Sequence, residues 1–186
     1  MTGLYCDSLA QEKQSTVNML GAILKQLLEG DRVPEPVRQA FREGKRGFGG
    51  RALRLSDLVK ILKMTIASLS EVFICIDGLD ECLPNNRREL LESLQEVVQA
   101  SSATRVFLTG RPHIRDEIKT YFSKATVIPV IPTIGDIEMY LRMKLVRDSI
   151  PGAMDDDLKA EIMRVIPRKI SQMCVETVLT KPGLVG

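Results

Sequence analysis

The stretch VFICIDGLDE, residues 72–81, decides the fold of this chain. Its first five residues are apolar, mostly β-favouring, and do not alternate with polar residues. Such a run predicts a strand buried on both faces, as in a parallel sheet that helices cover on either side. The run ends in three carboxylates, Asp77, Asp80 and Glu81.

Short β-rich runs alternate with helical patterns along the rest of the chain. This alternation is typical of βαβ units, so we predict an α/β fold with a mainly parallel sheet flanked by helices. Pro129 favours an edge position for the last strand, because it cannot donate to a ladder. We expect strands near residues 4–6, 72–76, 105–109 and 125–131, and helices over 16–30, 34–41, 56–69, 86–98, 114–122, 133–145 and 155–167.

The helix ends carry their own signals. Asn86 and Glu89 form a candidate capping pair, and Pro167 predicts the end of the last helix. From Cys174 to Gly186 the pattern fades, which predicts a frayed C-terminus.

Composition limits the class of protein. The chain has 186 residues, a mass of 20.7 kDa and a formal net charge of +2, so neither a nucleic acid nor a membrane surface is an expected partner. No apolar run reaches the roughly 18 residues that a membrane span needs. The four cysteines lack metal-ligand spacing and are too few for a disulfide framework. Two of them flank an acidic loop and one lies in a very apolar run, which favours reduced thiols and a cytoplasmic location.

The acidic stretch after the 72–76 run is the first candidate site. Ligands of open parallel sheets bind at the carboxyl ends of the strands. Mg²⁺ would offset the repulsion among three carboxylates, with Asp77 as its ligand. Asp80 or Glu81 could then orient or activate an attacking water. The alternative is a solvated acidic turn after a core strand.

The strand at 105–109 predicts a second part of the same site. Thr109 and Arg111 would reach the same sheet edge as Asp77. A guanidinium there can bind phosphate and stabilise charge on a leaving phosphoryl group. The alternative is that Arg111 simply pairs with one of the nearby acids.

Three segments together resemble a known family. Residues 73–82 resemble the Walker B segment of NACHT-type signalling NTPases, including fungal members and the nephrocystin-3-like group. Residues 105–112 resemble the sensor-1 strand, and residues 5–7 with 17–21 resemble the segment after the family's first helix. The resemblance covers roughly residues 3–173 and depends on the order and spacing of the motifs.

The resemblance implies a P-loop NTPase fold of the STAND class that binds ATP or GTP with Mg²⁺ and switches between two states. Carried over by position, Asp77 holds Mg²⁺, and Asp80 and Glu81 hold or polarise the attacking water. Thr109 and Arg111 contact the nucleotide side of the site, with Arg111 sensing the terminal phosphate.

The sequence also departs from this family. It contains no Gly-x-x-x-x-Gly-Lys-[Ser/Thr] phosphate loop, and the glycine-rich residues 44–51 lack the Lys-[Ser/Thr] pair. In the family, the strand that carries this loop lies between the sensor-1 strand and the last strand. We therefore expect the strands at 105–109 and 125–131 either to pair directly or to leave exposed edges.

The resulting hypothesis divides the chain into two parts. Residues 1–150 would be a partial NACHT-like NTPase domain without its P-loop strand, and residues 151–186 the start of a helical lid region. The expected function is that of a truncated NTPase domain from a signalling switch, not competent for hydrolysis alone. The alternatives are a non-catalytic interaction module, which self-associates or pairs with full-length relatives, and a decayed gene copy. A stand-alone carboxylate–Mg²⁺ phosphohydrolase ranks last.

Overall fold

The computed structural model describes residues 1–28, 54–147, 154–170 and 175–180, together with residues 35, 38, 39 and 42. The chain forms two compact units, one of residues 1–128 and 176–186 and the other of residues 129–175. A compact unit need not equal a family domain, so the division expected at residue 150 stays a prediction. The helix expected at 34–41 and the loop at 44–51 lie outside the described residues, apart from those isolated positions.

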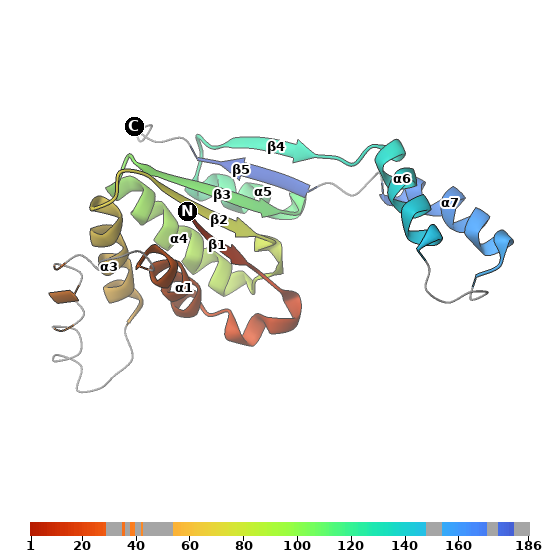
Figure 1. The fold of residues 1–186 in the computed structure, drawn as a ribbon. Coiled ribbons are helices and arrows are strands. Elements are labelled where there is room, and N and C mark those ends of the chain that lie inside the picture. The colour runs from red at the N-terminus through yellow and green to blue at the C-terminus, as the bar shows by residue number, and fades with distance from the viewer. Residues whose placement is uncertain are drawn as a thin grey trace. The chain divides into compact units, whose positions relative to one another are not determined.

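A five-stranded sheet forms the framework (Figure 1). Its order is β1-β2-β3-β5-β4, and β1 pairs with β2 and β2 with β3 in parallel. The α/β fold is thereby confirmed, with a mixed sheet whose first part is parallel, and β4 lies at the edge that Pro129 predicted. The strands are β1 (Thr2–Tyr5), β2 (Val72–Asp77), β3 (Thr104–Gly110), β4 (Thr126–Val130) and β5 (Val175–Leu179).

The expectation of a frayed C-terminus is wrong for β5, which pairs antiparallel with β3 and lies between β3 and β4. It lies where the family resemblance expects the P-loop strand, so β3 and β4 neither pair directly nor leave an open gap. Thr180 closes this pairing, because its N–H donates to the Val106 carbonyl (3.0 Å) and its Oγ1 accepts from the Val106 N–H (2.9 Å). The unpaired backbone beside β3 provides the template for this added strand.

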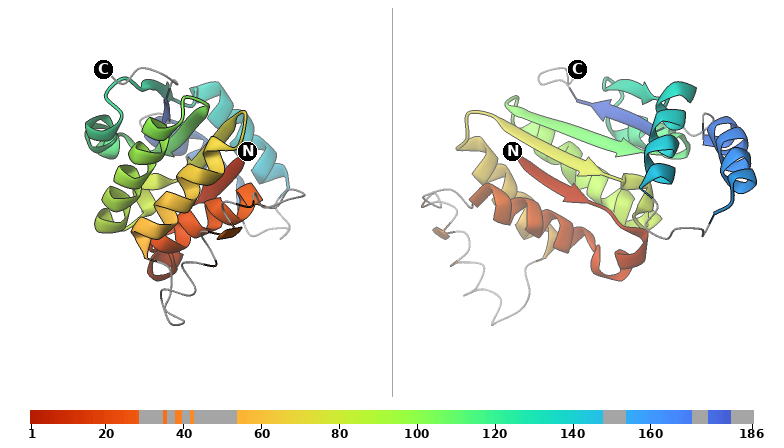
Figure 2. Two further views of the ribbon diagram at one scale, coloured as in Figure 1. Left: turned by 90° about the vertical axis from the view of Figure 1, so that its left-hand side faces the viewer. Right: turned by 45° about the vertical axis from the view of Figure 1, so that its right-hand side comes forward.

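Helices cover one face of the sheet (Figure 2). The expected helices of this region are confirmed, but the Asn86–Glu89 capping pair is wrong. Helix α4 begins one turn earlier, with Leu83 at its N-cap and Pro84 in its first turn, and Asn86 instead donates to the Gln14 carbonyl (3.0 Å). The helices are α1 (Thr16–Leu28), α3 (Leu55–Ala67), α4 (Pro84–Ala100) and α5 (Arg115–Tyr121), with the 3₁₀ turns η1 (Ser8–Lys13), η2 (Leu79–Glu81) and η3 (Pro112–Ile114).

The prediction that the central strand is buried on both faces is wrong. Along β2 the side chains alternate, with Val72, Ile74 and Ile76 buried against the helices and Phe73 37% exposed. Phe107 of β3 is exposed to the same extent and lies on the same face as Phe73. An apolar side chain on an open face hides the alternation that a half-buried strand normally shows.

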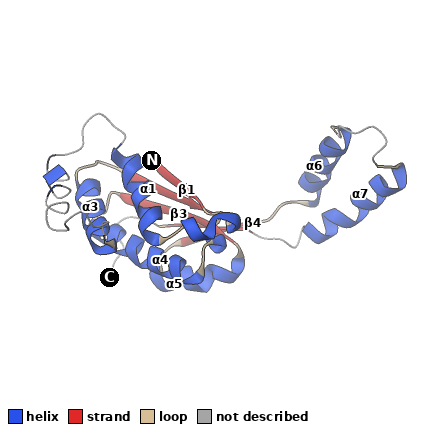
Figure 3. Cartoon of the chain, turned by 90° about the horizontal axis from the view of Figure 1, so that it is seen from below, coloured by secondary structure: helices blue, strands red, loops and turns tan. Residues whose placement is uncertain are grey.

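The second compact unit contains α6 (Ile134–Val146) and α7 (Asp156–Ile170), seen in Figure 3. Thr133 and Asp136 form a capping box at the start of α6. Helix α7 does not end at Pro167 as predicted but runs on to Ile170, because a proline inside a helix removes one hydrogen bond without always ending the helix. None of the helices that the structure describes is long and apolar enough to cross a membrane.

Candidate functional site

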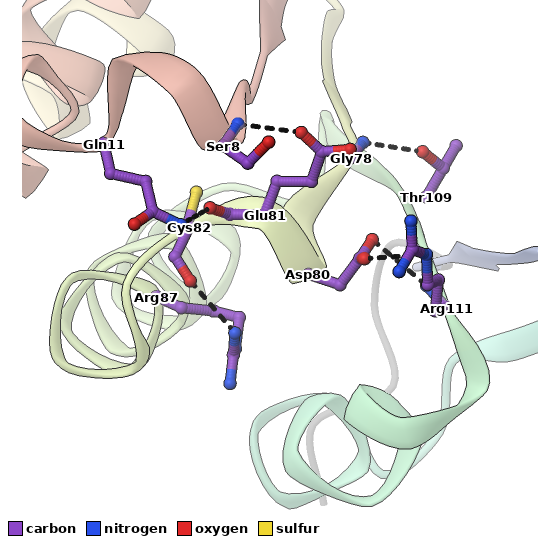
Figure 4. A network of polar contacts seen from close by, with 9 residues as sticks. All are labelled: Ser8, Gln11, Gly78, Asp80, Glu81, Cys82, Arg87, Thr109 and Arg111. Atoms are coloured by element: carbon purple, nitrogen blue, oxygen red, sulfur yellow. Dashed lines mark hydrogen bonds and ion pairs between the residues drawn. The ribbon is translucent and has the colours of Figure 1, made fainter.

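Three turns meet at the carboxyl ends of the parallel strands (Figure 4). The predicted site residues lie at the ends of β2 and β3 or on the turns that follow these two strands. The first turn links β1 to η1, the second contains η2 after β2, and the third follows β3. The parallel register places Tyr5 opposite Asp77 and brings the ends of β2 and β3 together. The sequence prediction that these residues share one sheet edge therefore matches their positions, although their chemical roles stay predictions.

Asp77 and Thr109 are in direct contact at this edge. The Thr109 hydroxyl donates to Oδ1 of Asp77 and accepts a hydrogen bond from the Gly78 N–H (3.0 Å). Gly78 has a φ of 69°, in the left-handed region that favours glycine, and an added Cβ would lie 3.1 Å from the Cys6 carbonyl oxygen. Glycine at this position therefore lets the turn after β2 pass close to the end of β1.

Asp80 faces Arg111. Their ion pair measures 3.4 Å between Nε and Oδ2, and the Arg111 N–H donates to Oδ1 at 3.2 Å. The Asp80 side chain is 8% exposed, whereas that of Arg111 is 62% exposed. The structure thus has the alternative arrangement, in which Arg111 pairs with a nearby acid. Asp80 also holds the turn after β3 through the backbone N–H of Arg111.

Glu81 points toward η1 (Figure 4). Its Oε2 accepts a hydrogen bond from the Ser8 N–H (2.8 Å), and its carbonyl accepts one from Gln11 Nε2 (2.7 Å). The adjacent acids Asp80 and Glu81 therefore bind opposite sides of the edge, one to the turn after β3 and one to the turn after β1.

The sequence analysis did not predict two buried contacts next to this edge, one made by Arg87 and one between two cysteines. Arg87 is buried and bridges α4 to α5, since its Nε donates to Glu117 (2.9 Å) and its Nη1 to the Cys82 carbonyl (3.1 Å). The Sγ atoms of Cys6 and Cys82, both almost fully buried, lie 3.0 Å apart. Parallel pairing of residues 2–5 with the strand at 72–77 would have brought these cysteines together, but the pairing was not deduced.

The contact between the two thiols shifts their pKa values in opposite directions. The hydrogen bond between the two thiols, together with the nearby Arg87 charge, lowers the pKa of Cys82 against burial and the charges of Asp80 and Glu81, which raise it. The same hydrogen bond, burial and the negative charges of Cys82, Asp77 and Glu81 raise the pKa of Cys6 far above its ordinary value. These opposite directions make Cys82 the more acidic thiol of the pair.

The side chains at this edge determine whether it could hold a metal ion. Within the described part of the chain, no three His, Cys, Asp or Glu side chains converge to hold one. Asp77, beside Thr109, is the residue that could hold a Mg²⁺ ion here, since Mg²⁺ commonly keeps several waters and takes other oxygens from phosphate groups. A bound nucleotide would have to supply those phosphates.

Fold and site define an α/β protein with a carboxylate-rich edge at the ends of its parallel strands. The family model described as nephrocystin 3, N-terminal, matches residues 2–111. The match spans more than half of the chain, which belongs to this family. The nephrocystin-3-like part of the resemblance is thereby confirmed. Neither the comparison with curated proteins nor that with solved structures gave a significant match.

Proposed function

We propose that this chain carries the metal- and water-facing half of a NACHT-type nucleotide site, from a P-loop protein that acts as a signalling switch. The observation that supports the proposal is the convergence of Asp77, Asp80, Thr109 and Arg111 at the carboxyl ends of two adjacent parallel strands. Ligands of open α/β sheets bind at such edges.

Each residue has a distinct role in this proposal. Asp77, oriented by Thr109, takes the Mg²⁺ ion that ATP or GTP brings, through water or directly. When bound, Mg²⁺ would neutralise part of the negative charge on the nucleotide phosphates. Arg111 is exposed and would leave Asp80 to contact the terminal phosphate, since a phosphate with a higher negative charge competes for the guanidinium.

The chain alone is proposed to lack turnover. Its 186 residues contain no Gly-x-x-x-x-Gly-Lys-[Ser/Thr] loop, whose backbone N–H groups and lysine would hold the β- and γ-phosphates. The two carboxylates expected at the attacking water are also engaged, Asp80 with Arg111 and Glu81 with Ser8. A nucleotide can shift a switch only if it binds the two states with different affinity. Arg111 could provide this difference by contacting phosphate in one state and Asp80 in the other.

The test is Mg²⁺-dependent binding and hydrolysis of ATP and GTP by the whole chain. We expect weak Mg²⁺-dependent binding that Asp77→Asn abolishes and that Asp157→Asn, a matched change on α7, leaves intact. Multiple turnover that Asp77→Ala removes would contradict the proposal that the chain is not competent alone. Binding that is equal in wild type and Asp77→Asn would contradict the proposed site.

A second candidate function is a non-catalytic interaction module that self-associates or pairs with full-length relatives. The observation that favours it is the open face of the sheet, where Tyr5, Phe73 and Phe107 are exposed. No helix that the structure describes in the first compact unit lies over these side chains. An exposed apolar face of this kind commonly marks an interaction surface. The cytoplasmic location stays a prediction under either candidate.

A further inference from the structure

The paired thiols of Cys6 and Cys82 stand apart from every role assigned above. They are 76 residues apart in the chain, and each directly follows a structural element, Cys6 after β1 and Cys82 after η2. Their sulfurs lie 3.0 Å apart, and Cys6 and Cys82 are 1% and 2% exposed. A disulfide has an S–S length of about 2.05 Å, so a movement of about 1 Å would join them.

The backbone around the pair is fixed from both sides. The Cys6 N–H donates to the Asp77 carbonyl (2.9 Å), and the Cys82 carbonyl accepts from Arg87 (3.1 Å). Because Cys6 is held at the end of β2 and Cys82 at the start of α4, the sulfurs remain adjacent through small motions of the side chains. A thiol pair held in register by the fold reacts with itself rather than with distant cysteines.

A small cavity reaches the Cys6 side of this pair. It has a volume of about 180 Å³ and is lined by Cys6, with Gln14 and Met19 on its wall. Both of these residues also approach Cys82, whose Sγ lies 3.8 Å from the Gln14 oxygen and 4.0 Å from the Met19 sulfur. The cavity therefore offers a small hydroperoxide a route to the Cys6 side of the pair.

We infer that Cys6 and Cys82 form a peroxide-responsive dithiol site, in which oxidation by hydrogen peroxide or another small hydroperoxide closes a Cys6–Cys82 disulfide. In the first step the Cys82 thiolate attacks one peroxide oxygen and the O–O bond breaks. Cys82 becomes a sulfenic acid, and the leaving hydroxide takes up a proton to form water.

The second step uses the neighbouring thiol. The Cys6 sulfur attacks the Cys82 sulfur, the S–OH bond breaks, and the hydroxyl group leaves as water with the proton from Cys6. Overall two thiols and one hydrogen peroxide give one disulfide and two waters, so two electrons pass from the thiols to the peroxide. The lowered pKa of Cys82 supports its role as the first nucleophile.

The product would change the candidate edge. A Cys6–Cys82 disulfide ties the end of β1 covalently to the turn that carries Asp80 and Glu81. That turn is already held by Ser8 and Gln11, so the disulfide adds a covalent link to the same contact. Oxidation would therefore stabilise this edge, and a reductant would reverse the effect.

The experiment treats the folded, reduced chain with one equivalent of hydrogen peroxide, then alkylates the remaining thiols after denaturation and maps the peptides by mass spectrometry. We expect the loss of two thiols per chain and a Cys6–Cys82 cross-linked peptide. The oxidised chain should unfold at a higher urea concentration than the reduced chain, and dithiothreitol should reverse the shift. A matched Cys75→Ser variant should give the same cross-link.

Three results would contradict the inference or its first step. Retention of all thiols in the folded chain, or a cross-link that uses Cys75 or Cys174 instead, would overturn the inference. In Cys82→Ala the Cys6 thiol should stay reduced at the same peroxide concentration, and equal oxidation of Cys6 there would exclude Cys82 as the first nucleophile. If Cys82→Ala does not fold, the peptide map of the wild-type chain still decides.

Discussion

Glu81 accepts a hydrogen bond from the backbone N–H of Ser8, 73 residues earlier in the chain, at a distance of 2.8 Å. An acid that the sequence assigns to catalysis thus holds η1 against the turn after β2. A carboxylate that accepts from a backbone N–H forms one of the stronger classes of hydrogen bond. The acidic turn is therefore part of the scaffold at this edge as well as a candidate site.

The first prediction tests that contact. Glu81→Ala should lower the free energy of unfolding by about 1 kcal/mol, because it removes the hydrogen bond that the exposed Ser8 backbone N–H donates to a carboxylate. Urea unfolding followed by far-UV circular dichroism measures the change. Glu81→Gln keeps an acceptor and should recover about half of the loss.

Glu12, an exposed acid on η1, supplies the matched control. Glu12→Ala should change stability by less than about 0.5 kcal/mol, as is usual for surface positions. Equal effects of Glu81→Ala and Glu12→Ala would show that the bond to Ser8 contributes nothing.

The second prediction concerns Arg87. Arg87→Ala should destabilise the chain by about 2–3 kcal/mol, because it leaves the Glu117 carboxylate and the Cys82 carbonyl without their buried donor. Arg88, the exposed neighbour, should tolerate the same change. In a double-mutant cycle, Arg87→Ala and Glu117→Ala should be strongly non-additive, and additive effects would exclude the ion pair as the cause.

Most of the first compact unit was predictable from sequence because its signals are local. Alternating β-rich and helical runs gave the elements, and the carboxylates after residue 76 gave the edge. The direction in which each acid points was not predictable. Asp80 and Glu81 are adjacent, yet one contacts Arg111 and the other Ser8, since turn geometry around Gly78 sets their directions.

The errors of the sequence analysis come from long-range pairing. Residues 175–179 carry a β-favouring pattern, but only an unfilled position beside β3 makes them a strand. The open face of the sheet was missed because Phe73 and Phe107 are apolar like core residues. Neither fact can be read from a local window of sequence.

The third prediction tests that open face as an interaction surface. Phe107→Ser should weaken concentration-dependent self-association, measured by sedimentation velocity, by about tenfold if it removes about 1.4 kcal/mol of contact energy. Leu83→Ser is the control, since Leu83 is 41% exposed at the start of α4. A monomeric wild-type chain at all concentrations, or equal effects of both variants, would contradict the interaction module.

The last prediction is a pH profile set by the thiol pair under reducing conditions. In the unfolded chain both thiols ionise near their ordinary pKa of 9.0, whereas in the folded chain Cys82 ionises earlier and Cys6 later. Between the lowered pKa of Cys82 and pH 9 the unfolded state holds more protons, so the pair's contribution to stability rises with pH. Above pH 9 the folded state holds more, and the contribution falls by up to about 1.4 kcal/mol per pH unit.

The comparison of wild type with Cys6→Ala isolates this term, because the substitution removes the hydrogen bond that causes both shifts. Urea unfolding from pH 7 to pH 10.5 should give a stability difference between the two proteins that passes through a maximum near pH 9. Cys75→Ala keeps the pair and should follow the wild-type profile at every pH. A difference between wild type and Cys6→Ala that is constant across this range would mean that the two sulfurs share no proton, and the acidity assigned to Cys82 would then be wrong.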